Sequence, residues 1–162
     1  MKLCNAEIMK RIKLLEQEKS EIEEEEQRIC TTTYQSDSDK LSSDYNFKNT
    51  RNKIGYINTE IRDLKHHLNF SNSTVPTGYY YMTIGECLIY MAQINKEKEI
   101  LESLVCKEQV SRHSTYNGVI EYTQLNYDKA ECKERLKKIK EDIAEIQIAI
   151  DRTNLTNEIE IE

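Results

Sequence analysis

Few residues of this chain have the types and spacing that catalysis or metal binding requires. His66 and His67 are adjacent, so on a helix their side chains diverge by about 100° and cannot chelate one metal ion as a pair four residues apart can. His113 with a cysteine elsewhere could form a nucleophilic pair, but no spacing supports one. The sequence contains no GxSxG, HExxH, P-loop lysine or dinucleotide fingerprint. We therefore expect no enzymatic activity, no metal site and no cofactor.

Tyrosine is the residue type with the most scope for binding. The chain has 10 tyrosines and no tryptophan. Several of them lie near predicted connections, namely Tyr79, Tyr80, Tyr81, Tyr116, Tyr122 and Tyr127. A tyrosine offers a flat stacking face and a hydroxyl, so beside an arginine or lysine it can hold an anionic ligand that carries a base. The alternative is that these rings only pack the loop and the hairpin against the helices.

A ligand site of this kind predicts a specific set of residues. We expect the arginines to pair with phosphate, the tyrosines to stack, and an asparagine to hydrogen-bond a sugar or a base edge. The predicted ligand-binding residues are Arg112, Tyr116, Tyr122, Lys129, Arg152 and Asn154.

The asparagine of this set belongs to a short internal echo. Residues 150–156 repeat the pattern of residues 68–74: an aliphatic residue, Asn or Asp, any residue, Ser or Thr, then Asn. Helix capping explains such a pattern. The alternative is that two similar polar helix ends meet and line one pocket.

Composition favours amphipathic helices and excludes several classes. The 162 residues are 38% hydrophobic and 32% charged, with a mean hydropathy of −0.75, 4 glycines and 1 proline, which is too few turn residues for a β-sandwich or a nucleotide-binding α/β fold. The net charge of −6 argues against a nucleic-acid partner. No apolar run approaches the roughly 18 residues of a membrane span, and Glu7, Lys10 and Arg11 interrupt any signal-peptide core. Five widely spaced cysteines indicate reduced thiols, so we expect a cytoplasmic protein without a membrane partner.

The elements that must position these residues are four long helices. We expect them at about residues 3–30, 47–70, 83–107 and 125–152. Heptad seams mark the second and fourth most clearly, through Ile54, Ile57, Ile61, Leu64 and Leu68 and through Leu136, Ile139, Ile143, Ile146 and Ile150. Lys19, Glu26 and Lys98 interrupt the seams of the other two. Seams this narrow usually need a partner helix.

The predicted connections differ from one another. Residues 31–45 are polar and indicate a mobile loop, whereas Thr83 and Glu86 have the spacing of a capping box that begins the third helix. Asn117 and Gly118 predict a two-residue turn within a β-hairpin over residues 110–124. That turn would place Tyr116 opposite Val119, Ser114 opposite Glu121 and Arg112 opposite Thr123, with Tyr122 on the other face. An isolated hairpin is marginal in water, so it should lie on the helices or pair with a second subunit.

Charge is distributed in two blocks. Glu21 and Glu23–Glu26 form an acidic block, and six basic residues form another, namely Lys129, Lys133, Arg135, Lys137, Lys138 and Lys140. We interpret them as solvated helix faces that attract each other within or between chains.

Together these features predict a mainly α fold. The whole chain, residues 1–162, would be a single helical domain of long antiparallel helices in a bundle or coiled-coil arrangement, with one β-hairpin, and would form a homo-oligomer.

Several short features resemble the septicolysin-like family of small bacterial helical proteins. They are the Met1-Lys2-Leu3 opening, the helix end at Asn72, the Met82-Thr83 helix start, the Ser/Tyr-rich hairpin and the closing Thr153-Asn154-x-Thr156-x-Glu158 segment. The resemblance covers most of the chain in order and supports a helical fold. The family label also implies pore formation, but the apolar faces are narrow and the chain is acidic.

The function that we predict is capture of a small ligand. A non-catalytic, oligomeric binding protein would hold a small anionic, nucleotide-type ligand and could sequester a signal, as a sponge, in a bacterium or a bacteriophage. The alternative is a structural coiled-coil scaffold or interaction protein. Pore formation is the third and least favoured interpretation.

Overall fold

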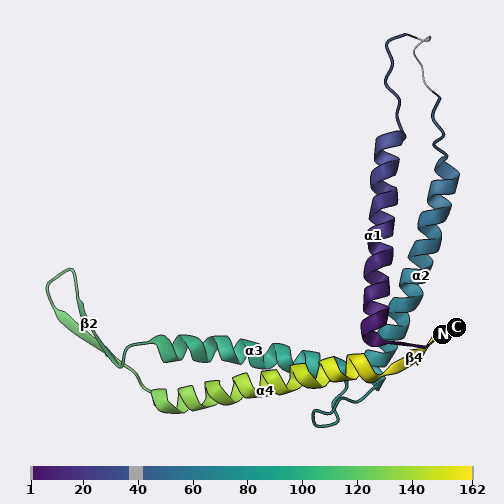
Figure 1. Cartoon of the computed structure of the whole chain (residues 1–162). Helices are drawn as coiled ribbons and strands as arrows, with labels where there is room; N and C mark the ends of the chain where they lie inside the picture. Colours follow the sequence, from purple (N-terminus) through teal and green to yellow (C-terminus); the bar gives the residue numbers. More distant parts are fainter. Residues whose placement is uncertain (1, 37–41, 162) are drawn as a thin grey trace. The chain divides into compact units, whose positions relative to one another are not determined.

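The computed structural model describes residues 2–36 and 42–161, and the described part is mainly helical (Figure 1). Its helices are α1 (Asn5–Ile29), α2 (Phe47–Thr74), α3 (Ile84–Cys106) and α4 (Lys129–Thr156). Its strands are β1 (Lys2–Cys4), β2 (Val110–Ser114), β3 (Ile120–Gln124) and β4 (Glu158–Glu160). A mainly helical chain with a β-hairpin between its third and fourth helices is therefore confirmed.

The element bounds differ from the expected ones at a few ends. The first helix begins at Asn5, because the residues before it form β1, which pairs with β4 in an antiparallel register of Leu3 opposite Ile159. The last helix begins at Lys129 and continues to Thr156. The expected loop over residues 31–45 has no helix or strand in its described parts, and residues 37–41 lie outside the described residues.

The chain divides into two compact units. Unit 1 consists of Met1–Val75 and Asn154–Glu162, and unit 2 consists of Pro76–Thr153. The helix α4 therefore belongs to unit 2 for most of its length and contributes its last residues to unit 1.

Unit 1 is held together by the seam between α1 and α2. The buried residues are Ile8, Ile12, Ile57, Ile61 and Leu64. They recur at steps of three and four, so each helix presents one apolar stripe to the other. Ion pairs flank the seam, including Arg11 with Glu60 at 2.5 Å.

Unit 2 repeats this construction with α3 and α4. Its buried residues are Tyr79, Ile84, Cys87, Ile94, Leu101, Ile139, Ile146 and Ile150. The guanidinium of Arg135 donates to both carboxylate oxygens of Glu97, at 2.7 and 3.0 Å, across the same pair of helices. That contact lowers the pKa of Glu97 and raises the pKa of Arg135.

The two units also begin in the same way. In unit 1, Cys4 pairs with Glu158, and the Cys4 backbone N–H donates to the Glu7 carboxylate at 2.8 Å. In unit 2, Thr83 bridges to Pro76 and donates its backbone N–H to Glu86 at 2.8 Å. Each unit therefore has a helix start capped by a glutamate and paired with the residues that follow a helix end, and the capping box predicted at Thr83 is confirmed.

Candidate functional site

The candidate site begins with the loop that joins β2 and β3. The Thr115 N–H donates to the Val119 carbonyl at 2.9 Å, so residues 116–118 form the loop. Gly118 adopts a φ of 73°, whereas Asn117 does not have a positive φ. The predicted two-residue turn is therefore wrong, because it needs a positive φ at both positions. A three-residue loop that ends in a left-handed glycine is the next commonest hairpin connection.

The longer loop shifts the register by one residue. Arg112 lies opposite Tyr122 rather than opposite Thr123. Directly opposed side chains share a face and have Cβ atoms about 4.5–5.5 Å apart. The expected register had placed Arg112 and Tyr122 on different faces, so the hairpin brings two predicted ligand residues together in a way that sequence reasoning missed.

The face that carries this pair is open to solvent. Its members are Val110, Arg112, Ser114, Ile120, Tyr122 and Gln124. Tyr122 is 67% exposed, and every residue of β2 and β3 except Ser111 is exposed. Within one chain the hairpin therefore does not lie on the helices, and its pairing with a second subunit stays a prediction.

The tip and the base of the hairpin carry two more predicted residues. Tyr116 is fully exposed in the loop. Lys129, at the start of α4, donates from Nζ to the Lys107 carbonyl at 2.6 Å, and the Tyr127 hydroxyl donates to the Leu104 carbonyl at 2.7 Å. Both contacts go to carbonyls at the end of α3, where a helix leaves acceptors available, and the Leu104 carbonyl also accepts from the Lys107 N–H at 3.3 Å. The hairpin is thus fastened at its base.

The remaining two predicted residues lie at the far end of α4. Arg152 follows Lys129 by 23 helical residues, which corresponds to about 35 Å along the helix. Asn154 accepts a hydrogen bond at Oδ1 from Asn5 Nδ2 at 3.1 Å. One chain therefore groups Arg112, Tyr116, Tyr122 and Lys129 around the hairpin and leaves Arg152 and Asn154 apart from them.

Asn154 belongs to a buried polar network in unit 1. Ser71 Oγ donates to Asn5 Oδ1 at 3.0 Å, and Asn157 Nδ2 donates to Ser71 Oγ at 3.0 Å. Asn5 is fully buried and Ser71 is 3% exposed. Among the described residues, no buried side-chain nitrogen or oxygen lacks a partner. The polar helix ends of the internal echo therefore meet through Asn5, in a packed and satisfied network.

The tyrosine run before α3 divides into one buried and two exposed rings. Tyr79 is 9% exposed, and burial, with a smaller contribution from Asp142, raises its pKa to about 12. Tyr80 and Tyr81 are 80% and 91% exposed and have φ values of 47° and 57°. Such values are uncommon outside glycine, and here a tight turn imposes them, with Thr77 N–H donating to the Met82 carbonyl at 2.7 Å. Tyr79 thus packs, whereas the other two rings face solvent.

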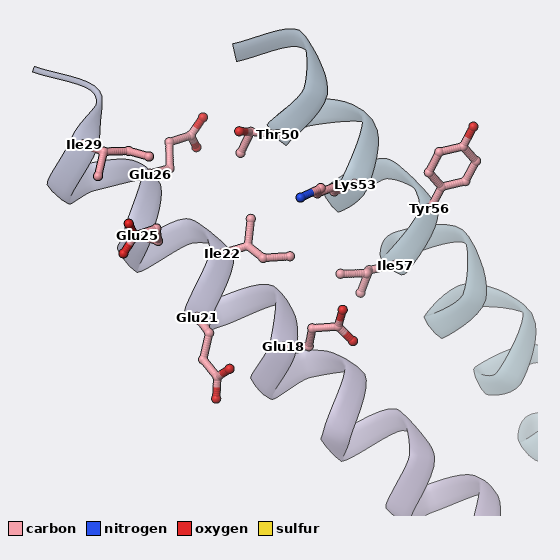
Figure 2. Close-up of a pocket in the computed structure, with 10 residues that line it drawn as sticks. All are labelled: Glu18, Glu21, Ile22, Glu25, Glu26, Ile29, Thr50, Lys53, Tyr56 and Ile57. Carbon is pink, nitrogen blue, oxygen red and sulfur yellow. The ribbon is translucent and has the colours of Figure 1, made fainter. Parts of the chain in front are cut away.

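A concave feature lies in unit 1 between α1 and α2. This groove of about 710 Å³ is lined by Glu18, Glu21, Ile22, Glu25, Glu26, Ile29, Thr50, Lys53, Tyr56 and Ile57. Ile22 and Ile57 point toward each other across it (Figure 2). Glu26 is 9% exposed; it forms an ion pair with Arg51 and accepts a hydrogen bond from the Tyr45 hydroxyl at 2.7 Å. Sequence reasoning treated Glu26 as a break in the seam and as part of a solvated acidic block, whereas it is buried and paired. The signal that it is paired was an acidic seam position with an arginine on the partner helix.

The described residues contain few features of reactive chemistry. Residues 2–36 and 42–161 hold no group of three His, Cys, Asp or Glu side chains placed to bind a metal ion. The five cysteines are unpaired, with Cys87 buried and Cys30 and Cys106 exposed. None of the described helices is sufficiently long and apolar to span a membrane.

Comparisons with known proteins support the fold and nothing beyond it. No family model matches the sequence, and no curated protein matches it at a significant level. The structure is similar to the crystal structure of a functionally unknown conserved protein from Corynebacterium diphtheriae, with a TM-score of 0.65 and 15% sequence identity. The similarity covers 99% of this chain and 100% of that one. At this identity the match establishes a shared fold.

Proposed function

We propose that this protein is a non-catalytic, oligomeric binding protein of the cytoplasm that captures a small anionic, nucleotide-type ligand. The observation that carries the proposal is the cross-strand pair of Arg112 and Tyr122 on an exposed hairpin face. The guanidinium offers a planar fork of N–H donors that matches a phosphate, and the neighbouring ring offers a stacking surface for a base.

The open hairpin face explains why we expect an oligomer. A small-molecule site usually buries 70–90% of its ligand, which a flat two-stranded face cannot do alone. Val110 and Ile120, 53% and 45% exposed on the same face, give a second copy an apolar surface to cover. The ligand would then lie between two chains, and a protein of this kind could act as a sponge that sequesters a signal.

A structural scaffold is the competing function, and one observation favours it. The outer surfaces of the unit 2 helices expose large apolar residues, namely Ile89 at 64%, Ile100 at 55% and Ile148 at 58%. These side chains lie outside the buried seam and could dock other helices. Pore formation has no comparable support, because the apolar stripes are narrow.

Ligand-induced stabilisation separates binding from scaffolding. A ligand at a hundredfold excess over Kd stabilises the folded state by about 2.7 kcal/mol. We expect a rise in melting temperature with one member of a panel of mono-, di- and cyclic nucleotides, including ADP-ribose types. Mass spectrometry of material that co-purifies with the protein provides an independent way to identify the ligand.

Substitutions in the hairpin and near the end of α4 then locate the site. We expect Arg112→Ala or Tyr122→Ala to remove the shift and Arg152→Ala to preserve it, with Arg62→Ala as an exposed control on α2. If only Arg152→Ala removed the shift, the ligand would bind at the other end of α4. If no ligand shifted the melting temperature and none co-purified, the scaffold would be the better interpretation.

A further inference from the structure

We propose that the acidic groove between α1 and α2 is the docking site for the basic face of α4 from a second copy of the chain. This inference rests on the self-association in the proposed function and is independent of the ligand. It names the surface and the partner helix that would form the oligomer.

The floor of the groove is apolar and incompletely covered. Ile57 is buried, whereas Ile22 is half-buried and Ile29 is 36% exposed. Tyr56, at the edge of the groove, is 79% exposed. A further helix on this groove would remove that apolar surface from water, which is the main favourable contribution to association.

The α1 side of the groove carries a regular stripe of exposed residues. Counted backwards along the helix, the stripe is Glu25, Glu21, Glu18 and Leu14, at steps of four, three and four. Leu14 is 66% exposed, and within the described part of the chain Glu18 has no hydrogen-bond or ion-pair partner. The surrounding segment, residues 16–26, holds seven glutamates and one lysine, so its potential favours a cationic partner.

The first half of α4 carries the complementary stripe. Counted forwards, the stripe is Lys133, Lys137, Lys140 and Ala144, again at steps of four, three and four. These residues line one shallow hollow of about 420 Å³ together with Leu136 and Glu141, and Glu141 forms an ion pair with Lys137. Residues 129–140 hold six basic and two acidic residues, so this half of α4 has a net positive charge.

The two stripes match when the helices lie antiparallel. Successive residues are about 6.0, 4.5 and 6.0 Å apart along both axes. The resulting pairs are Lys133 with Glu25, Lys137 with Glu21, Lys140 with Glu18, and Ala144 with Leu14. A parallel arrangement has the same spacing but would place Lys133 on Leu14 and Glu25 on Ala144. The residue types therefore select the antiparallel direction.

A second copy of this chain satisfies the match completely. Each chain supplies one groove and one basic helix, so in the proposed dimer each chain would offer its basic stripe to the groove of the other. These contacts would replace exposed ion pairs within the chain, namely Glu25 with Arg28, Lys137 with Glu141 and Lys140 with Glu102. Closed twofold dimers of this kind are the commonest form of soluble homo-oligomer.

Charge reversal on the two stripes tests the proposal. The acidic variant is Glu18→Lys/Glu21→Lys, the basic variant is Lys137→Glu/Lys140→Glu, and Glu23→Lys/Glu24→Lys is a control with the same charge change elsewhere on α1. We expect sedimentation at micromolar concentration to give twice the 19.1 kDa of one chain for the wild type and the control. Each variant alone should self-associate at least tenfold more weakly, and an equimolar mixture should restore the dimer, because both contacts are then attractive.

Each other outcome overturns the inference in a distinguishable way. A wild type that sediments as one chain would refute self-association and therefore both the inference and the oligomer in the proposed function. A dimer that both variants retain would place the interface elsewhere while leaving the oligomer intact. In a third outcome, a chain that carries all four substitutions dimerises again while the equimolar mixture of the two variants does not. That result would mean that the groove does not bind α4 of a second copy. Circular dichroism of each variant establishes that the helices are folded.

Discussion

The side-chain amide of Asn5 donates a hydrogen bond to Oδ1 of Asn154 at 3.1 Å, although the two residues are 149 positions apart in the chain. Asn5 also accepts from the Ser71 hydroxyl, so one buried amide connects the start of α1 with the ends of α2 and α4. Asn5 is fully buried, so without these hydrogen bonds its polar side chain would have no partner, neither protein nor water.

Removal of this amide should destabilise the protein. We expect Asn5→Ala to lower the free energy of unfolding by about 1–3 kcal/mol, because it leaves the buried Ser71 hydroxyl and the Asn154 amide with fewer partners. Asn52→Ala, at an exposed position of α2, should change it by less than about 0.5 kcal/mol. Urea denaturation followed by circular dichroism measures both. Equal effects would show that the network contributes nothing specific.

Two isoleucines of α4 provide a matched test of the unit 2 core. Ile146 is fully buried and Ile148 is 58% exposed. We expect Ile146→Ala to cost about 2–5 kcal/mol through lost burial and the cavity that remains, and Ile148→Ala to cost less than about 0.5 kcal/mol. Chemical denaturation of the two variants gives the comparison. A reversed order would contradict the helix orientation described above.

The capping glutamate of α3 should make stability depend on pH. A hydrogen bond from the Thr83 backbone N–H, with a second from its hydroxyl, holds the pKa of Glu86 below its ordinary value of 4.5. The stabilising contribution is therefore present above that value and is lost as the pH falls through the folded-state pKa. We expect the melting temperature of the wild type to fall in acid. The melting temperature of Glu86→Gln should fall less steeply.

A control glutamate separates this effect from general acid sensitivity. Glu99→Gln changes an exposed glutamate of the same helix and should keep the wild-type slope of melting temperature against pH. If Glu86→Gln also kept that slope, the cap would not be the titrating group responsible.

Substitution of Gly118, the glycine with a left-handed conformation, should destabilise the hairpin without affecting the helices. Nothing lies within 4 Å of a Cβ at Gly118, so Gly118→Ala has space and suffers only from its φ of 73°, at a cost of about 1–2 kcal/mol. Because an isolated hairpin is marginal, we expect faster tryptic cleavage at Arg112 with unchanged helical circular dichroism. Asn117→Ala, without a positive φ, should be cleaved at the wild-type rate. Equal cleavage rates for Gly118→Ala and Asn117→Ala would contradict the three-residue loop.

The helices could be predicted from the sequence because their signals are local. Steps of three and four among Ile57, Ile61 and Leu64 identify both the helix and its buried face, and Thr83 with Glu86 marks a helix start. The pairing of β1 with β4 could not be predicted in this way. Each strand has three residues, too few for an alternating pattern, and its partner lies at the other end of the chain.

Sequence reasoning about the candidate site addressed its residue types more than its geometry. Arginine and tyrosine within the hairpin indicated binding, but a one-residue difference in loop length decides whether Arg112 and Tyr122 share a face. The dipeptide Asn-Gly favours the shorter loop, and the choice between the two depends on backbone twist that the sequence does not state. Arg152 and Asn154 were grouped with the hairpin by chemistry alone, without the length of α4 that separates them.

The pairing of β1 with β4 also determines the order in which the protein can form during translation. Unit 2 is one continuous segment, so it can fold as soon as it has emerged from the ribosome. Unit 1 requires Asn154, Asn157 and β4, which follow Val75 by up to 85 residues. At roughly 5–20 residues per second, the first half of the chain waits about 4–17 s for its last strand and its buried hydrogen-bond partners. The part of the protein that is made first is therefore the part that is completed last.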